Sequence, residues 1–539
     1  MTFRSPYPPV EIPDVSVYDY VFGGLDGPAA DATAFVHGPT GETVSYRQLA
    51  ERIDAAAGAL AGLGVRVGDV VALQAPNSPD FAVAFHGILR AGATATTLPV
   101  MATREDVSRQ LASCGAVAII VDAALAGTAL PAAAEHGIPA GRMILIGDAD
   151  GSGSAGTGAG TTLAALVAQH AEPPEVSFDP ATHVAALPYS SGTTGRPKGV
   201  MLSHRNLVAN IAQIEERIGV DPDDVVMAVL PFFHIYGMTV LLNLVLQRRA
   251  TLVTMPRFEL DGFLDLMDRH RVTFAFIAPP IAVVLAKHPA VEKRDLSALR
   301  VAFSGAAPLD GELGRAVERR LGLRMLQGYG MSELSPVSHM IPADSEDIPC
   351  ETVGRPIPNT ENKLLDPATG AEIDPPAEGV SAAGELCVRG PNVMLGYLGD
   401  NAATAAMIDP DGFLHTGDVA TVDRHGNITI VDRIKELIKY KGYQVPPAEL
   451  EALLLTHPQI ADAAVIGVPD EEGNEVPKAF VVRQAGAEIT AGEVMDFVAE
   501  RVAPYKKVRV VEFADAVPKS SSGKILRREL RDRERVRTA

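Results

Sequence analysis

The feature that most constrains the fold is a regular alternation of strand-like and helix-like segments through the first several hundred of the 539 residues. Strands are expected at residues 70–74, 94–100, 116–122 and 143–147, and an apolar helix is expected at residues 81–90. Such alternation is typical of βαβ units, because parallel strands need a helical crossover. The sequence therefore predicts an α/β protein with a largely parallel sheet.

A second alternating block places unusual loops at the ends of strands. Strands are expected at residues 272–277, 299–303 and 324–327, with helices after the first two. Each strand runs directly into a loop rich in glycine or proline. Ligands of parallel sheets bind beyond the carboxyl ends of the strands. We therefore expect the three loops to line one crevice.

Composition and charge exclude several classes of protein. Hydrophobic residues make up 47% and charged residues 21%, a balance typical of a soluble globular protein with a large core. The formal net charge of −20 argues against a general nucleic-acid binder, which needs a basic surface. The three cysteines are far apart and form no CxxC pair, so we expect neither a structural zinc site nor disulfides. This cysteine usage fits a reducing, cytoplasmic location.

One apolar stretch, residues 227–246, is long enough to cross a bilayer. It contains Pro231, His234, Gly237 and Asn243, which are unusual in a membrane helix. We interpret the stretch as a buried strand, a loop and then a core helix, and expect no stable insertion into a membrane.

The character of the chain changes in its last quarter. Residues 413–423 and 428–434 predict a β-hairpin, since a short polar turn containing glycine separates two alternating runs. A lysine-rich segment and a small α+β unit follow. The sequence thus predicts a large N-terminal domain of mixed and parallel sheets with helices, residues 1–432, and a small α+β C-terminal domain, residues 433–539.

The strongest single motif is the segment at residues 189–200, between a strand-like run and a helix that begins near Ser203. Its glycines permit close backbone approach, and its N–H and hydroxyl groups are suited to donate to polyphosphate. It lacks the Gly-Lys-Ser/Thr frame of the P-loop. As a generic polar segment it fits a surface loop about equally well. The candidate phosphate ligands are Ser190, Ser191, Gly192, Thr193, Thr194, Gly195 and Lys198.

This segment resembles the phosphate loop of the adenylate-forming superfamily, which includes acyl-CoA synthetases, luciferases and nonribosomal adenylation enzymes. The similarity extends from about residue 3 to residue 528 and is closest to the 4-coumarate–CoA ligase family. It implies ATP, Mg²⁺ and coenzyme A as cofactors. It also implies two steps, in which a carboxylic acid is first activated as its adenylate and the acyl group is then transferred to coenzyme A.

The resemblance also assigns the nucleotide site. Tyr329 would lie against adenine, Ser332 (threonine in most relatives) would contact the α-phosphate, and Glu333 would hold Mg²⁺, which favours oxygen ligands. Asp418 would bind the ribose hydroxyls. Without the resemblance, a glutamate in such a loop is more often solvated, and Asp418 fits a turn residue about equally well. The other implied nucleotide contacts are Gly305, Ala306, Ala307, Pro308, Gln327, Gly328, Gly330, Met331, Arg433, Lys441 and Gly442.

Two lysine sites in the C-terminal domain are implied to act in turn. Lys524 would reach the carboxylate and α-phosphate during adenylation. The small domain would be mobile, with Lys435 as its hinge, so that Lys439 and Gln444 would serve thioester formation. By composition alone these basic runs are more often solvated faces. His234 would border the acyl group and the thiol path, although a lone histidine among apolar residues is more often a core residue.

The acyl pocket is the least constrained part of the resemblance. His234, Tyr236, Gly305, Gly330, Pro336 and Val337 are implied to line it. Glycines that leave room for a flat ring suit 4-coumarate or a related cinnamate. Residues 334–335 and 237–238 differ from plant relatives, so a medium-chain fatty acid stays open as an alternative substrate. Further alternatives are a free-standing enzyme that feeds a carrier protein, a luciferase-type oxygenase and a non-enzymatic nucleotide-binding module.

Overall fold

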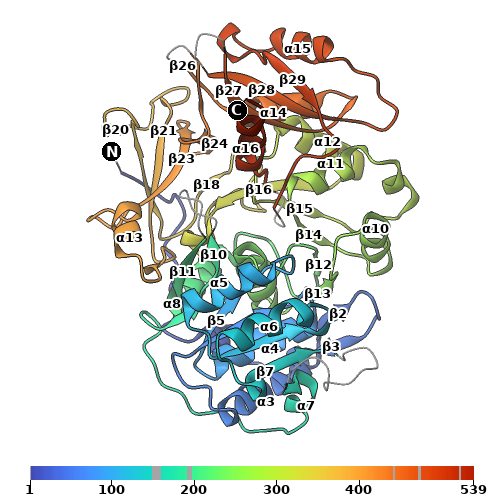
Figure 1. Ribbon diagram of the computed structural model, residues 1–539, viewed down its shortest axis with the longest axis vertical. Helices are drawn as coiled ribbons and strands as arrows, with labels where there is room; N and C mark the ends of the chain where they lie inside the picture. Colours follow the sequence, from blue (N-terminus) through green and yellow to red (C-terminus); the bar gives the residue numbers. More distant parts are fainter. Residues whose placement is uncertain are drawn as a thin grey trace.

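The protein is described by a computed structural model that covers residues 2–147, 160–190, 197–440, 443–470, 475–520 and 524–538, with the backbone alone at residues 443, 444 and 536–538. Two large sheets with covering helices, a third sheet at their side and a smaller C-terminal unit make up the molecule (Figure 1). The predicted fold class is confirmed.

The first large sheet contains the strands expected near the N-terminus. β5 (Thr94–Thr97), β4 (Val70–Gln74), β6 (Ala118–Asp122) and β7 (Met143–Ile146) lie side by side and run parallel. The helix between the first two is α4 (Pro79–Arg90), whose N-terminus is capped by the Ser78 hydroxyl. β5 ends earlier than expected, because the proline that follows two residues later has no N–H for the strand ladder.

The second large sheet carries the three predicted loops. Its central strands run parallel in the order β16 (Arg324–Gly330), β15 (Val301–Ser304), β14 (Phe274–Ile277), β12 (Val225–Ala228) and β13 (Thr251–Thr254). β16 is three residues longer than expected. Its last residues pair with the antiparallel strand β17 (Val337–Met340), so the predicted adenine loop begins as part of a strand.

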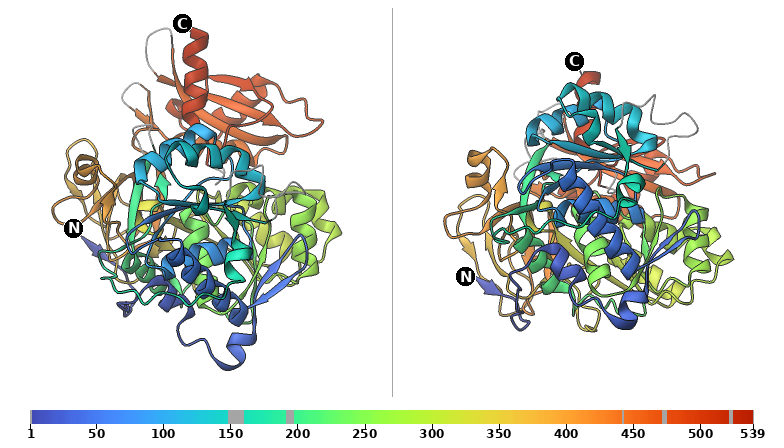
Figure 2. Two further views of the ribbon diagram at one scale, coloured as in Figure 1. Left: turned by 60° about the horizontal axis from the view of Figure 1, so that its bottom comes forward. Right: turned by 90° about the horizontal axis from the view of Figure 1, so that it is seen from below.

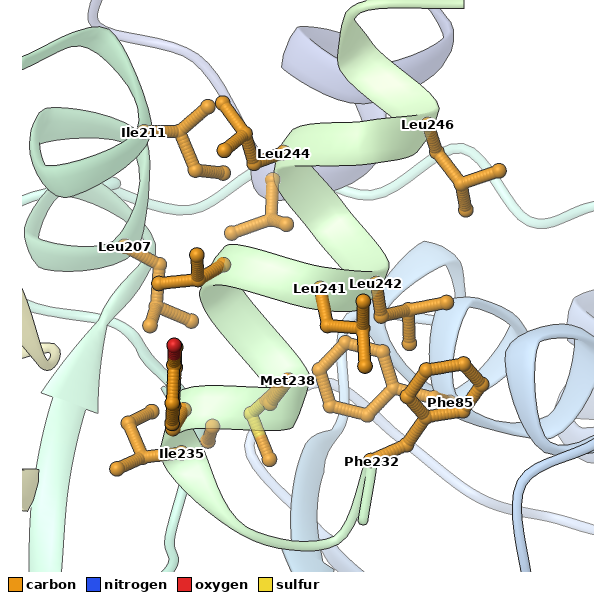
Figure 3. Packing of buried hydrophobic residues seen from close by; sticks show 14 of the residues in the cluster. Phe85, Leu207, Ile211, Phe232, Ile235, Met238, Leu241, Leu242, Leu244 and Leu246 are labelled. Atoms are coloured by element: carbon orange, nitrogen blue, oxygen red, sulfur yellow. The ribbon is translucent and has the colours of Figure 1, made fainter. Parts of the chain in front are cut away.

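The apolar stretch at residues 227–246 is a buried strand, a turn and a core helix, as expected. The helical part is a π-helix, Tyr236–Asn243, that continues into α9 (Leu244–Gln247). Figure 3 shows its side chains between Leu207 and Ile211 of α8 (His204–Ile214) and Phe85 of α4. Burying each such side chain contributes about 1.5–3 kcal/mol. Among the described residues no helix is both long and apolar enough to cross a membrane.

The hairpin predicted late in the chain closes the third sheet. β23 (Leu414–Val422) pairs antiparallel with β24 (Ile428–Arg433) and, on its other edge, with β21 (Gly384–Arg389). The turn between β23 and β24 is held by the Asp423 carboxylate, which accepts hydrogen bonds from the backbone N–H groups of His425 and Asn427.

The C-terminal unit has its own sheet and its own hydrophobic cores. β27 (Ile460–Pro469), β28 (Glu475–Arg483) and β29 (Val510–Phe513) form the sheet, and helices α14 (Pro447–Thr456), α15 (Ala491–Ala499) and α16 (Arg527–Thr538) accompany it. Figure 2 shows this unit on one side of the larger domain.

Helix α14 is held at both ends by charged side chains from the larger domain. The Asp432 carboxylate accepts a hydrogen bond of 2.9 Å from the Ala448 N–H at the N-terminus of the helix. The Lys287 ammonium donates one of 2.7 Å to the Leu455 carbonyl at the C-terminus. Both charges have the sign that the helix dipole favours. We call this pair the α14 clamp.

Candidate functional site

Side chains from β16 and from the β23–β24 hairpin, which are far apart in the sequence, meet around Asp418. The Tyr329 hydroxyl donates a 2.6 Å hydrogen bond to one carboxylate oxygen of Asp418, and Arg433 Nε donates one of 3.1 Å to the other. Asp418 is only 5% exposed, so these partners offset the cost of burying its charge. Burial and the Asp418 carboxylate raise the pKa of the Tyr329 phenol well above its usual value, which keeps it a donor. The residues predicted to bind adenine and ribose are therefore in direct contact.

The backbone before Asp418 is held by Glu385, which the sequence did not single out. One Glu385 oxygen accepts a 3.1 Å hydrogen bond from the Gly417 N–H, and the other lies 3.0 Å from His415 Nδ1. Gly417 has φ of +69°, a left-handed conformation that glycine adopts without strain. Cys387 joins Glu385 and His415 in a group with metal-ligand chemistry. The hydrogen bonds of Glu385 identify the group as a support for the part of β23 that presents Asp418.

The predicted metal ligand Glu333 is buried, with 4% of its surface exposed. Its Oε1 accepts hydrogen bonds from the Ser190 hydroxyl, at 2.9 Å, and from the Tyr397 hydroxyl, at 2.8 Å. Its Oε2 accepts no hydrogen bond from the part of the chain that the structure describes. Glu333 thus joins the segment before the phosphate loop to a tyrosine that sequence reasoning missed.

The predicted phosphate loop lies between β10 (Tyr189–Ser190) and β11 (Lys198–Ser203), which pair antiparallel. Lys198 Nζ lies 3.5 Å from an Asp400 carboxylate oxygen and 4.9 Å from the centre of the Tyr397 ring. The other candidate phosphate ligands, Ser191, Gly192, Thr193, Thr194 and Gly195, lie outside the described residues.

The loop after β15 passes beside the end of β16. Ala306 has φ of +70°, which is uncommon for a residue with a side chain. Such backbone conformations cluster at functional sites. The buried Gln327 side chain supports this loop, since its amide donates to the Cys350 carbonyl at 2.6 Å and accepts from the Leu309 N–H at 3.4 Å. Gln327 is therefore bonded to protein groups. Ala306, Ala307 and Pro308 are exposed or partly exposed, and Gly328, Met331 and Ser332 are partly exposed.

The predicted acyl-pocket residues form two contacting groups. A Cβ built on Gly305 would lie 2.7 Å from the Tyr236 ring. A Cβ on Gly330 would lie 2.0 Å from the Pro336 carbonyl, and Gly330 pairs with Val337. A side chain at either position would clash with a neighbouring residue, so both positions require glycine.

Lys524 lies close enough to the Asp418 group for their charges to interact. Burial and the Arg433 guanidinium lower its pKa, and Asp418 opposes them, leaving a pKa of about 8. The pKa of His234 is lowered to about 4, by burial and by the Lys524 ammonium, so this imidazole is neutral. The backbone of Lys524 makes two hydrogen bonds with Ser520, whose hydroxyl accepts from the Lys524 N–H and whose N–H donates to the Lys524 carbonyl.

The second predicted lysine site lies on another element. Lys439 is an exposed residue of β25 (Ile438–Tyr440), opposite Gln444 of β26 (Tyr443–Val445), and its N–H donates to Glu475 at 2.9 Å. The pKa of Lys435 is lowered by burial and by the Arg433 charge. Lys441, Gly442 and the side chain of Gln444 lie outside the described residues. The structure therefore brings Lys524 to Asp418 and leaves Lys439 exposed on a separate hairpin.

Comparison with known proteins agrees with this geometry. Residues 26–398 match the family model of AMP-binding enzymes, and residues 449–524 match that of the AMP-binding enzyme C-terminal domain. 4-Coumarate–CoA ligase 3 of Oryza sativa subsp. japonica is 41% identical over 99% of this chain and 95% of its own length. 4-Coumarate–CoA ligase 2 of Petroselinum crispum is also 41% identical, over 98% of this chain and 96% of its own.

Solved structures show the same architecture. ATP-bound MatB from Rhodopseudomonas palustris is 30% identical, with a TM-score of 0.85 over 97% of this chain and 99% of its own. The anthranilate–CoA ligase AuaEII, in complex with anthranoyl-AMP, is 25% identical, with a TM-score of 0.87 over 97% of this chain and 98% of its own. Since a family model covers more than half of the residues and the relatives align over nearly all of them, the chain belongs to the AMP-binding enzyme family.

Proposed function

We propose that the protein is an ATP-dependent acid–CoA ligase that acts on 4-coumarate or a related cinnamate through an acyl-adenylate. The observation that carries this proposal is the meeting of Lys524 with the Asp418–Tyr329–Arg433 group, which joins the two domains at one nucleotide site. The choice of acid rests on the relatives, which are named for 4-coumarate.

In the first step the substrate carboxylate attacks the α-phosphorus of ATP and pyrophosphate leaves. Negative charge builds on the phosphoryl oxygens, and the Lys524 ammonium is placed to offset it. The buried Glu333, whose Oε2 accepts no hydrogen bond from the described residues, suits Mg²⁺, which prefers carboxylate oxygens. When bound, Mg²⁺ would offset charge on the phosphates. Asp418 would accept hydrogen bonds from the ribose, and Ser190, Lys198 and the loop between them would bind phosphate.

In the second step the sulfur of coenzyme A attacks the acyl carbon and AMP leaves. We propose that the C-terminal domain rotates about Lys435, which withdraws Lys524 and presents Lys439 and Gln444. In support, Lys439 is exposed on its own hairpin while Lys524 is partly buried. The neutral His234 would border the path of the coenzyme A thiol. Because it carries no charge, it would not repel the Lys524 ammonium.

The sheet pairings support a domain boundary close to residues 432 and 433. β24 ends at Arg433, which pairs with Asp418 in the third sheet, and the next hairpin, β25–β26, belongs to a different sheet. We propose that residues 1–432 form the adenylation domain and residues 433–539 the lid.

Ionisation of Lys524 predicts the pH dependence of adenylation. In the free enzyme the charged lysine is lost as the pH rises through its pKa of about 8, so kcat/KM for ATP should fall above that pH. Pyrophosphate release followed across the pH range measures this decrease in kcat/KM. The Lys524→Arg variant keeps its charge to higher pH, so its kcat/KM should begin to fall at a higher pH, even if its rate is lower. If kcat/KM falls at the same pH in both proteins, the ionisation belongs to another group.

Substitution of Gly305 tests the shape of the acyl pocket. In Gly305→Ala the new methyl group would lie 2.7 Å from the Tyr236 ring, so the ring must move and the space for a flat acyl group shrinks. We expect kcat/KM for cinnamates to fall about 10-fold, with a smaller loss for acetate or propionate, because the added methyl excludes bulk. Equal losses for all acids would place Gly305 away from the acyl group.

A screen of pyrophosphate release tests the function as a whole. Cinnamates, benzoates and medium-chain fatty acids are compared with and without coenzyme A, and the products are identified as AMP and thioester. Release that is strongest with cinnamates and yields the thioester supports the proposal. A preference for fatty acids favours an acyl-CoA synthetase of medium chains. Adenylate formation without any thioester favours a carrier protein as acceptor.

We also propose a cytoplasmic location. Cys114, Cys350 and Cys387 are free thiols in the structure, which fits a reducing compartment.

A further inference from the structure

Glu333 is oriented by two donors that bond the same oxygen. Ser190 and Tyr397 both donate to Oε1, at 2.9 and 2.8 Å, whereas Oε2 accepts no hydrogen bond from the described residues. The backbone carbonyl of Glu333 also accepts a 2.9 Å hydrogen bond from the Met394 N–H. A buried carboxylate held at both side chain and backbone has little freedom to turn. The Glu333 carboxylate is thus already oriented before a metal binds.

The segment that supplies Tyr397 also holds the strand after the phosphate loop. β22 (Gly396–Tyr397) pairs antiparallel with β11, and the Leu398 N–H donates to the Gly199 carbonyl at 2.9 Å. The Tyr397 ring lies under the Lys198 ammonium at 4.9 Å, a distance at which cation and ring attract. One tyrosine therefore contacts the predicted metal carboxylate through its hydroxyl and the predicted phosphate lysine through its ring.

Asp400 completes the arrangement, since its carboxylate lies 3.5 Å from Lys198 Nζ. The ion-pair partner of Lys198 is therefore Asp400 and not Glu333.

We propose that Tyr397 is a positioning residue that orients the Glu333 carboxylate for the metal–nucleotide complex and keeps Lys198 apart from it. This inference rests on the proposed function, because it takes Glu333 as the metal ligand and Lys198 as a phosphate ligand. Tyr397 would act through its contacts with Glu333 and Lys198. Its removal should weaken binding of the metal in the nucleotide complex and leave the fold intact.

Tyr397→Phe tests the inference, since it removes the hydroxyl and keeps the ring beneath Lys198. The full-length protein is mixed with the α,β-methylene analogue of ATP, which cannot be cleaved at the reacting bond, and with Mn²⁺ in place of Mg²⁺. Free Mn²⁺ is counted by electron paramagnetic resonance. We expect Mn²⁺ in the ternary complex to bind about 10-fold more weakly than in the wild type, since a hydrogen bond to a charged group is lost. The KM for Mg²⁺ in turnover should rise by a similar factor, with a smaller change in kcat.

Tyr20→Phe is the matched control, because Tyr20 also donates a 2.9 Å hydrogen bond to a part-buried glutamate, Glu215, outside the site. It should bind Mn²⁺ like the wild type. If Tyr397→Phe binds Mn²⁺ normally while Glu333→Gln does not, the inference is overturned and the proposed metal ligand stands. If Glu333→Gln also binds normally, both are overturned. A melting temperature that falls in Tyr397→Phe with unchanged Mn²⁺ affinity would give Tyr397 a purely structural role and also overturn the inference.

Discussion

Replacing Lys524 by alanine should slow adenylation about 10²-fold or more and leave the second half-reaction nearly unchanged. In this structure Lys524 lies beside Asp418 and Arg433, at the predicted nucleotide site, whereas Lys439 is exposed on a separate hairpin. The loss should therefore appear in pyrophosphate release and be absent when synthetic acyl-adenylate and coenzyme A are supplied. Single-turnover assays of the two half-reactions, adenylation and thioester formation, measure the difference.

The control for this experiment is Lys506→Ala, in the same domain, where the lysine forms an ion pair with Glu449. That variant should keep both half-reactions, since an exposed pair contributes little. Lys439→Ala should show the pattern opposite to that of Lys524→Ala. Equal loss of both half-reactions in Lys524→Ala would contradict the division of labour between the two lysines.

Replacing Asp418 by alanine should raise the KM for ATP about 10²-fold, which corresponds to about 2.7 kcal/mol. The change removes the predicted ribose acceptor. It also leaves Arg433 without its carboxylate partner and the Tyr329 hydroxyl without its acceptor. Pyrophosphate release as a function of ATP concentration measures the effect, and equilibrium binding of ATP should weaken in parallel.

Asp54 offers a matched control, because its Oδ1 also accepts hydrogen bonds from a tyrosine hydroxyl, that of Tyr18, and from an arginine Nε, that of Arg90. Asp54→Ala should leave the KM for ATP unchanged. Asp418→Asn, which retains an acceptor but no charge, should lie between the wild type and Asp418→Ala. An unchanged KM for ATP in Asp418→Ala would remove Asp418 from the nucleotide site.

The parallel sheets could be predicted because strand and helix periodicities differ and alternate clearly at residues 70–147 and 272–327. The presence of Tyr329 and Asp418 at one site was implied only by resemblance, since 89 residues separate them and neither is unusual by composition. Their direct contact was not predicted. Strand ends were less well predicted. β16 continues through Gly328–Gly330 because β17 pairs with it, and a partner strand is not visible in the local sequence of β16.

Two supporting residues were missed for the same physical reason. Glu385 and Tyr397 act through groups on other elements, Gly417 and Glu333, that are distant in the chain. A tyrosine after glycine, or a glutamate at the start of a strand, is ordinary in sequence. The π-helix at Tyr236–Asn243 was also missed, because its apolar residues fit a buried α-helix equally well.

The α14 clamp has a consequence for the energy of domain motion. Lys287 is exposed, so its contact with the helix end contributes only about 0.3–1 kcal/mol and is weakened by salt. Asp432 is buried, so its contact is screened much less. If the C-terminal domain rotates as proposed, this motion must break the exposed Lys287 contact. We therefore expect the equilibrium between the two proposed domain orientations to shift with ionic strength, through a residue remote from the nucleotide site.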